Sequence, residues 1–176
     1  MKPPVAVFGI GNRSRGDDAA GPLLVDYLVR WLGTQERRGE VECFEEYQLA
    51  PEHALDLVGR RLALFVDARL GLEDALSLER LEPAPAVFIA STHALSPGET
   101  LSVYRTVTGE APPPAFVLGV RAESFELGEP PGAITRAAIQ EAERLLVRLC
   151  RAPEEARWRD ALTRRPSPSP CARPPS

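Results

Sequence analysis

The sequence lacks the features that mark secreted and membrane-spanning proteins. It has only three cysteines, Cys43, Cys150 and Cys171, which are far apart and odd in number. This spacing excludes a CxxC redox motif and a cysteine-rich zinc site, and it fits reduced thiols in a cytosol. No apolar run approaches the roughly 20 residues that cross a bilayer, and the N-terminus has no basic-then-apolar signal pattern. We therefore expect a cytoplasmic protein with no membrane partner.

Positive charge is also too sparse and scattered for a nucleic-acid-binding protein. Lysine and arginine number 21 against 25 aspartates and glutamates, so the formal net charge is −4. Nucleic-acid-binding domains concentrate basic residues on one face, whereas here they are spread along the chain in short pairs. We do not expect nucleic acid as a partner.

The 176 residues allow one domain with a sizeable core but are too few for two domains that each have such a core.

What the sequence does contain is an alternation of short apolar runs and helical periodicity. The runs predict strands at 5–8, 41–47, 62–66, 87–90 and 116–120, and the periodic segments predict helices at 22–33, 51–59, 96–107 and 133–149. Such alternation is typical of an α/β sandwich around a central sheet. The segment 67–86 contains LEDALSLERLE, which fits a crossover helix or an irregular excursion, so one strand could run antiparallel.

The composition changes near residue 151. Residues 152–176 are rich in proline, arginine and serine, a composition that buries too little apolar surface to order a chain. We predict one folded domain over residues 1–151 and a disordered tail over 152–176.

The turn after the first predicted strand is rich in glycine and acidic. It reads FGIGNRSRGDDAAG over residues 8–21, with two adjacent carboxylates, Asp17 and Asp18. A glycine-rich turn between a strand and a helix often binds phosphate, but two aspartates would repel one. The turn therefore suits a cation. Capping of the following helix is the simpler role for such a residue, and we assign it to Asp17.

Three candidate metal ligands follow strands of the predicted sheet. Asp18 follows the first strand, Asp67 ends the third and His93 comes just after the fourth. Ligands of open α/β sheets bind beyond the carboxyl ends of the strands. Two carboxylates and one imidazole suit a borderline divalent metal such as nickel, zinc or cadmium. Taken singly, Asp67 could bond a turn amide and His93 could be structural. His53 has no nearby acidic partner in the sequence and is left structural or exposed.

Other catalytic signatures are absent from the sequence. It has no GxSxG nucleophile elbow and no HExxH zinc-protease motif. The third glycine of a dinucleotide-binding fingerprint would fall at Ser14, so GIGNRS is only a partial match.

An N-terminal signature and four motifs that follow it carry a resemblance to a known family. GIGNRSRGDDAAG resembles the N-terminal signature of the nickel–iron hydrogenase maturation endopeptidases, and LFVDA at 64–68, THALSP at 92–97 and ESFELGE at 123–129 follow in register, as does QLAPE at 48–52. The resemblance covers residues 5 to about 150. It implies a single three-layer α/β sandwich, in which helices flank a five-stranded, mixed and mostly parallel twisted sheet.

The resemblance also implies an activity and a site. Members of the family clip a C-terminal extension from the hydrogenase large-subunit precursor after nickel insertion. Their metal-contacting positions correspond to Asp18, Asp67 and His93, to which we assign the catalytic and metal-contacting roles; some relatives have glutamate at the first position. The expected partner is the precursor, the nickel is the precursor's own, and no organic cofactor is expected. Two rivals remain: a non-catalytic nickel-binding chaperone or sensor with the same three residues, and a nucleotide-dependent enzyme that uses GIGN as a phosphate loop.

Overall fold

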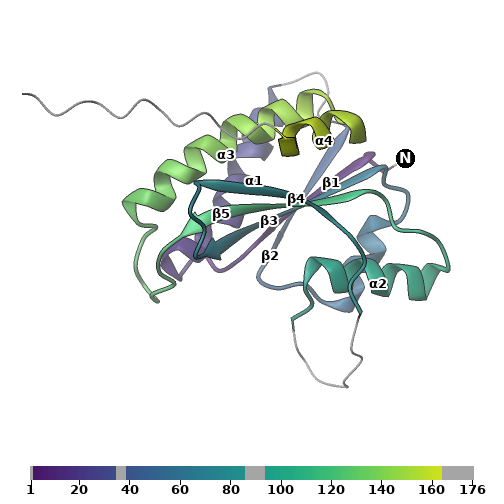
Figure 1. The fold of residues 1–176 in the computed structure, drawn as a ribbon, viewed down its shortest axis with the longest axis horizontal. Helices are drawn as coiled ribbons and strands as arrows, with labels where there is room; N and C mark the ends of the chain where they lie inside the picture. The colour runs from purple at the N-terminus through teal and green to yellow at the C-terminus, as the bar shows by residue number, and fades with distance from the viewer. Residues whose placement is uncertain (1, 35–38, 86–93, 164–176) are drawn as a thin grey trace, which may run out of the picture.

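The computed structural model describes residues 2–34, 39–85 and 94–163 (Figure 1). In chain order its elements are β1 (Val5–Ile10), the 3-10 helix η1 (Gly16–Ala19), α1 (Ala20–Gly33), β2 (Val41–Glu46), the 3-10 helix η2 (Pro51–Leu57), β3 (Leu62–Leu70), β4 (Leu76–Leu81), α2 (Pro97–Thr108), β5 (Ala115–Ala122), α3 (Ala133–Arg151) and α4 (Glu155–Thr163). None of the helices in these ranges is long and apolar enough to cross a membrane.

The described strands form one five-stranded sheet in the order β2-β1-β3-β5-β4. The β1–β2, β1–β3 and β3–β5 pairs are parallel, and β4 pairs antiparallel with β5 at the edge. The predicted mixed, mostly parallel α/β sheet is therefore confirmed. The LSLERL part of the uncertain segment forms β4, which is neither of the two conformations considered, although one strand does run antiparallel. The strand predicted at 87–90 lies outside the described residues.

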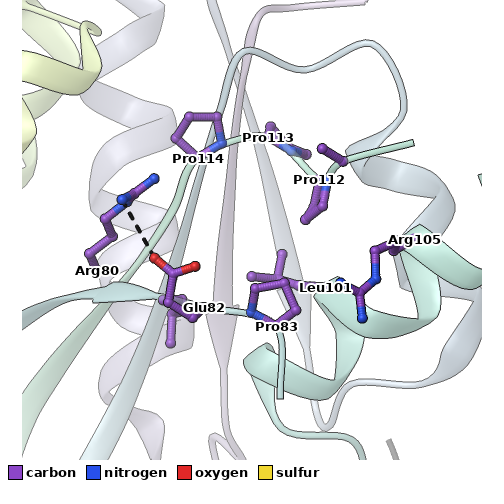
Figure 2. A pocket seen from close by; sticks show the side chains of 10 residues that line it. Arg80, Glu82, Pro83, Leu101, Arg105, Pro112, Pro113 and Pro114 are labelled. Atoms are coloured by element: carbon purple, nitrogen blue, oxygen red, sulfur yellow. Dashed lines mark ion pairs between the residues drawn. The ribbon is translucent and has the colours of Figure 1, made fainter. Parts of the chain in front are cut away.

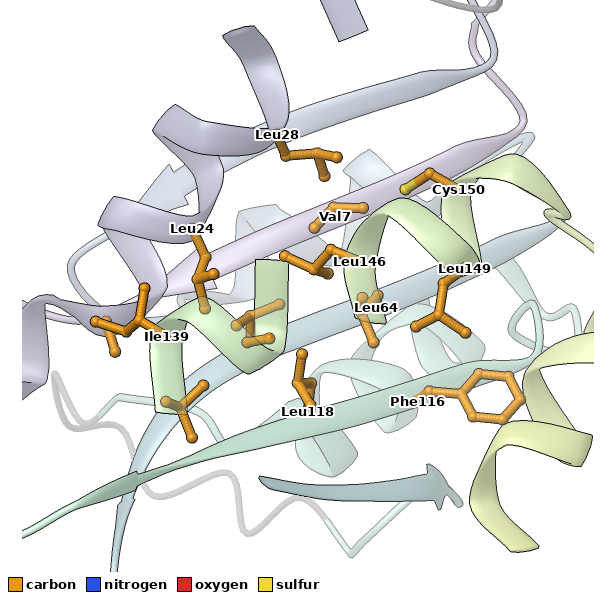
Figure 3. Packing of buried hydrophobic residues seen from close by; sticks show 14 of the residues in the cluster. Val7, Leu24, Leu28, Leu64, Phe116, Leu118, Ile139, Leu146, Leu149 and Cys150 are labelled. Atoms are coloured by element: carbon orange, nitrogen blue, oxygen red, sulfur yellow. The ribbon is translucent and has the colours of Figure 1, made fainter. Parts of the chain in front are cut away.

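Helices cover both faces of the sheet (Figure 1). On one face α1, α3 and α4 pack on the sheet, and Figure 3 shows side chains of α1 and α3 meeting those of β1, β3 and β5. On the other face η2 and α2 enclose a smaller core around Phe8 and Phe65. Alternate residues of β3 face the two cores, with Leu64 in the larger and Phe65 in the smaller. This double burial explains why β3 reads as a continuous apolar run.

β3 is longer than its apolar run. It continues past Asp67 to Leu70, because β5 offers pairing partners as far as Ala122, opposite Leu70. Asp67 therefore lies within the strand, opposite Gly119, rather than at its last residue as predicted.

The C-terminal segment is more ordered than its composition suggests. Residues Glu155–Thr163 form α4, so the prediction of a disordered tail from residue 152 is wrong for this part. Trp158 has no exposed surface. Its ring meets Phe116 edge-on at 5.4 Å between centroids, and its Nε1–H donates to the Leu149 carbonyl at 3.0 Å. One large apolar side chain thus anchors a helix that is otherwise mostly polar. Residues 164–176 of the predicted tail lie outside the described chain.

Candidate functional site

The connection between β1 and α1 is built on close backbone contact. A Cβ atom at Gly9 would overlap the Gly21 carbonyl oxygen, and one at Gly21 would overlap the backbone of Ile10. Only glycine at both positions lets the start of α1 lie directly on β1. This contact fixes the acidic turn at the carboxyl end of the strand.

Asp18 is held on the inner side of that turn. Its Oδ2 accepts a hydrogen bond from the Asn12 N–H at 2.9 Å, and its own N–H donates to the Arg15 carbonyl at 3.0 Å. Gly11 has a φ of +137°, and a side chain there would overlap the Asp18 carbonyl oxygen. The glycine therefore lets the turn fold tightly around Asp18.

Seven of the eight backbone N–H groups from position 11 to position 18 already donate hydrogen bonds within the protein. Those of Asn12 and Ser14 donate to side-chain oxygens of Asp18 and Asn12. The N–H groups at positions 11, 15, 16, 17 and 18 donate to backbone carbonyls. A phosphate loop needs such groups free to point at its ligand. The geometry opposes the nucleotide-dependent rival.

Asp67 lies on β3, the strand next to β1, and the charge of Asp18 affects its pKa. Burial and the nearby Asp18 carboxylate raise the pKa of Asp67 from 3.8 to about 6, against a smaller lowering by the Ala68 N–H and the Arg69 charge. Two carboxylates that repel each other in a half-buried position favour a cation between them. The predicted convergence of Asp18 and Asp67 at one end of the sheet is therefore seen in the structure.

This pair lies where the sheet topology changes direction. β1 lies between β2 and β3, so the chain leaves β1 to one side and returns to the other. In open α/β sheets such a switch point opens a crevice at the carboxyl ends of the strands, where ligands bind. Asp18 and Asp67 belong to the two sides of this point.

His93, the third predicted ligand, lies outside the described residues. Within the described ranges no group of three histidine, cysteine, aspartate or glutamate side chains is placed to hold a metal. The other histidine, His53, has an acidic partner that its sequence position does not reveal. Its Nε2 lies 3.1 Å from Glu46 Oε2, and its Nδ1 accepts from the Ala50 N–H at 2.8 Å.

Asp17 does not cap the following helix, so the role predicted for it is wrong. The structure records no side-chain cap for either η1 or α1. Asp17 is instead 2% exposed, and its carboxylate accepts hydrogen bonds from the N–H groups of Glu123, Ser124 and Gly132. Burial alone would raise the pKa of Asp17, but these donors outweigh it and lower the pKa.

Arg13 is a further residue that sequence reasoning missed. Its guanidinium binds both carboxylate oxygens of Glu45 on β2 at 2.6 Å and Asp26 on α1 at 2.8 Å. A planar guanidinium matches a carboxylate in this two-point geometry. The contact ties the outer side of the turn to two neighbouring elements. Its partners are far apart in the sequence, so no local pattern indicates them.

A pocket of about 310 Å³ lies elsewhere, between β4, α2 and the loop before β5 (Figure 2). Pro112, Pro113 and Pro114 form one wall, and Arg80 and Glu82 form an ion pair at 3.5 Å on its rim. Leu81, which also lines the pocket, pairs with Ala115, the first residue of β5. The pocket therefore lies at the amino end of the parallel strand, away from Asp18 and Asp67.

Comparisons with solved structures agree with this fold. No family model and no curated sequence matches the chain. Among solved structures, the hydrogenase maturating endopeptidase HYBD from E. coli is 25% identical, with a TM-score of 0.63 over 85% of this chain and 93% of that one. The NiFe hydrogenase maturation protease HycI from Thermococcus kodakarensis is 22% identical, with a TM-score of 0.61 over 84% of this chain and 92% of that one. An endopeptidase from Escherichia coli is 22% identical, with a TM-score of 0.59 over 89% and 93% of the two chains. The resemblance to the hydrogenase maturation endopeptidases that the sequence motifs indicate is therefore confirmed.

Proposed function

We propose that this chain is an endopeptidase that removes the C-terminal extension of the nickel–iron hydrogenase large-subunit precursor after nickel insertion, and that it recognises the bound nickel. The observation that carries the proposal is the pair Asp18 and Asp67 at the switch point, in a fold shared with the HYBD endopeptidase. The similar solved structures support endopeptidase activity for a chain of this fold.

In this proposal Asp18, Asp67 and His93 contact the nickel that the precursor already holds. Two carboxylates and an imidazole are ordinary ligands for such a metal and leave positions open for the ligands it brings. Burial and the repulsion by Asp18 together raise the pKa of Asp67 to about 6, and a bound cation would offset both effects. No organic cofactor is needed.

The reaction would then depend on placement of the scissile peptide. Docking of the precursor's nickel on these residues brings the peptide bond next to a water that is polarised by the metal or simply positioned for attack. Cysteine chemistry does not compete at the described positions, because burial raises the pKa of both Cys43 and Cys150 to about 12. A thiol with that pKa is not a nucleophile at neutral pH.

The alternative is a non-catalytic nickel-binding chaperone or sensor that uses the same residues. It predicts binding of the loaded precursor without loss of mass. The two activities are separated by mass spectrometry of the precursor after incubation, because only the endopeptidase shortens it.

The experiment compares the wild-type chain, Asp67→Asn and the exposed control Asp74→Asn on nickel-loaded precursor. We expect the wild type and Asp74→Asn to shorten the precursor at equal rates. Asp67→Asn should be slower by at least about tenfold, as for loss of a metal contact, while its circular dichroism stays unchanged. Cleavage by Asp67→Asn at the wild-type rate would contradict the site. Stable binding without cleavage by the wild type would favour the chaperone or sensor.

A further inference from the structure

The adjacent acids of the turn face different parts of the molecule. Asp18 faces the Gly11–Asn12 corner and the charge of Asp67, whereas Asp17 is buried against the loop between β5 and α3, residues 123–132. We infer that Asp17 is a positioning residue, whose carboxylate clamps the turn to the 123–132 loop and so holds Asp18 opposite Asp67. The inference rests on the proposed function only for the use made of Asp18.

The clamp uses both oxygens of the carboxylate. Oδ2 accepts from the N–H groups of Glu123 at 2.7 Å and Ser124 at 3.0 Å, and Oδ1 accepts from that of Gly132 at 2.7 Å. Gly132 is the N-cap of α3 and has no side chain with which to cap it. The Asp17 carboxylate therefore also places a negative charge at the positive end of that helix. Bonds from neutral donors to a carboxylate are stronger than those between neutral groups.

Backbone bonds reinforce the same contact. The Asp17 N–H donates to the Ser124 carbonyl at 3.1 Å, the Gly16 N–H to Glu129 at 3.0 Å, and the Gly128 N–H to Ser14 at 2.7 Å. The two segments consequently lie side by side at the carboxyl end of the sheet (Figure 1). Gly16 has a φ of +53°, and a Cβ there would lie 3.1 Å from the Ser124 carbonyl oxygen. The turn can approach the loop this closely because position 16 is glycine.

Fixing Asp17 also fixes Asp18, because both belong to the four-residue turn η1. Asp18 is then held from two directions. The loop holds its neighbour, and the Asn12 N–H holds its own carboxylate at 2.9 Å. This gives a physical role to the ESFELGE motif at 123–129, which contains no proposed ligand but supplies two of the three donors.

The position requires a carboxylate rather than an amide. Asparagine has one acceptor oxygen, and its NH2 group is a donor. In Asp17→Asn either the Gly132 N–H or the pair at Glu123 and Ser124 would face that donor. The substitution changes almost no volume, so its effect reports on hydrogen bonding rather than on packing.

The test is amide hydrogen exchange of the full chain without metal, measured by NMR well below the melting temperature. The variants are Asp17→Asn and, as the control for loss of one negative charge, Asp74→Asn. We expect the amides of Glu123, Ser124 and Gly132 to exchange at least about tenfold faster in Asp17→Asn, because buried donors lose their partners. The amide of Asn12, which reports on Asp18, should accelerate with them. The amide of Val117 in the centre of β5 should not change relative to the wild type.

A purely structural role predicts a different pattern. If the loop amides accelerate while Asn12 keeps its wild-type protection, Asp17 secures the loop without positioning Asp18, and the inference is overturned. Should Asp17→Asn not fold, Gly16→Ala serves as a milder variant. Its Cβ would lie 3.1 Å from the Ser124 carbonyl oxygen and so loosen the same contact while the Asp17 carboxylate is kept, and the same Asn12 readout decides.

A second readout connects the clamp to the metal site. Ni²⁺ alone is titrated into the wild type, Asp17→Asn and Asp74→Asn by calorimetry. We expect Asp17→Asn to bind at least about fivefold more weakly, since a misplaced ligand is a loss of preorganisation. Equal affinity in Asp17→Asn and the wild type would overturn the inference. Absence of precursor cleavage by the wild type would instead refute the proposed function, and it would leave the exchange comparison intact.

Discussion

At the scale of single residues, Asp17 and Asp67 differ in what surrounds them. Asp17 has three N–H donors and a lowered pKa, whereas Asp67 has burial and a like charge and a raised pKa. Burial therefore acts on both, but only Asp17 has enough donors to outweigh it. The N–H donors stabilise the charged form of Asp17, whereas burial and the charge of Asp18 destabilise the charged form of Asp67.

This difference predicts that Asp67 lowers the stability of the free protein at neutral pH. Its folded pKa of about 6 lies above its ordinary 3.8, so between these values the folded state binds more protons than the unfolded state. The stability that this group contributes is full below pH 3.8 and is lost as the pH rises through 6. Asp67→Asn should therefore raise the free energy of unfolding at pH 7.5 by about 1–3 kcal/mol, and the gain should shrink as the pH falls below 5.

Urea unfolding of Asp67→Asn and the wild type, at pH 7.5 and again below pH 5, measures this gain in the free energy of unfolding. Asp74→Asn is the control, because its exposed carboxylate should give a difference of less than about 0.5 kcal/mol at either pH. Equal or lower stability of Asp67→Asn at pH 7.5 would contradict the electrostatic account of the pair.

At the scale of elements, the fold depends on contacts that local sequence patterns reveal unequally. β3 and α3 could be predicted from the sequence, because burial requires a continuous apolar run in β3 and helical apolar periodicity in α3. β4 could not, because LSLERL combines residues that also form helices with only partial burial at the sheet edge. α4 is hidden by its polar composition, although one tryptophan anchors it in the larger core.

The anchoring role of Trp158 gives the element-scale prediction. Trp158→Ala should lower the free energy of unfolding by about 3–5 kcal/mol, because it removes a fully buried aromatic side chain. Its hydrogen bond to Leu149 is lost as well. Arg157→Ala, one residue earlier and exposed, is the matched control and should change stability by less than about 0.5 kcal/mol. Thermal melts of the two variants decide the point, and equal melting temperatures would show that α4 adds nothing to the domain.

At the scale of the whole molecule, the sheet order brings Asp18 and Asp67 together. Both could be predicted from the sequence, because each follows a strand signal and parallel strands present their carboxyl ends at one edge. The partners of Asp17 could not, since they lie 106 to 115 residues away in the chain and no local spacing encodes them. The contacts of Arg13 and the close packing of Gly21 against β1 could not be predicted either, because they form only in the assembled sheet.

We propose above that the site recognises nickel already bound to the precursor. This proposal is tested most directly by digesting nickel-loaded and nickel-free precursor side by side with one preparation of the enzyme, and following the mass of the precursor. Two carboxylates at the switch point have little to bind in a nickel-free precursor, so we expect only the loaded precursor to be shortened. Equal cleavage of both would contradict nickel recognition, and would mean that Asp18 and Asp67 serve the reaction in another way.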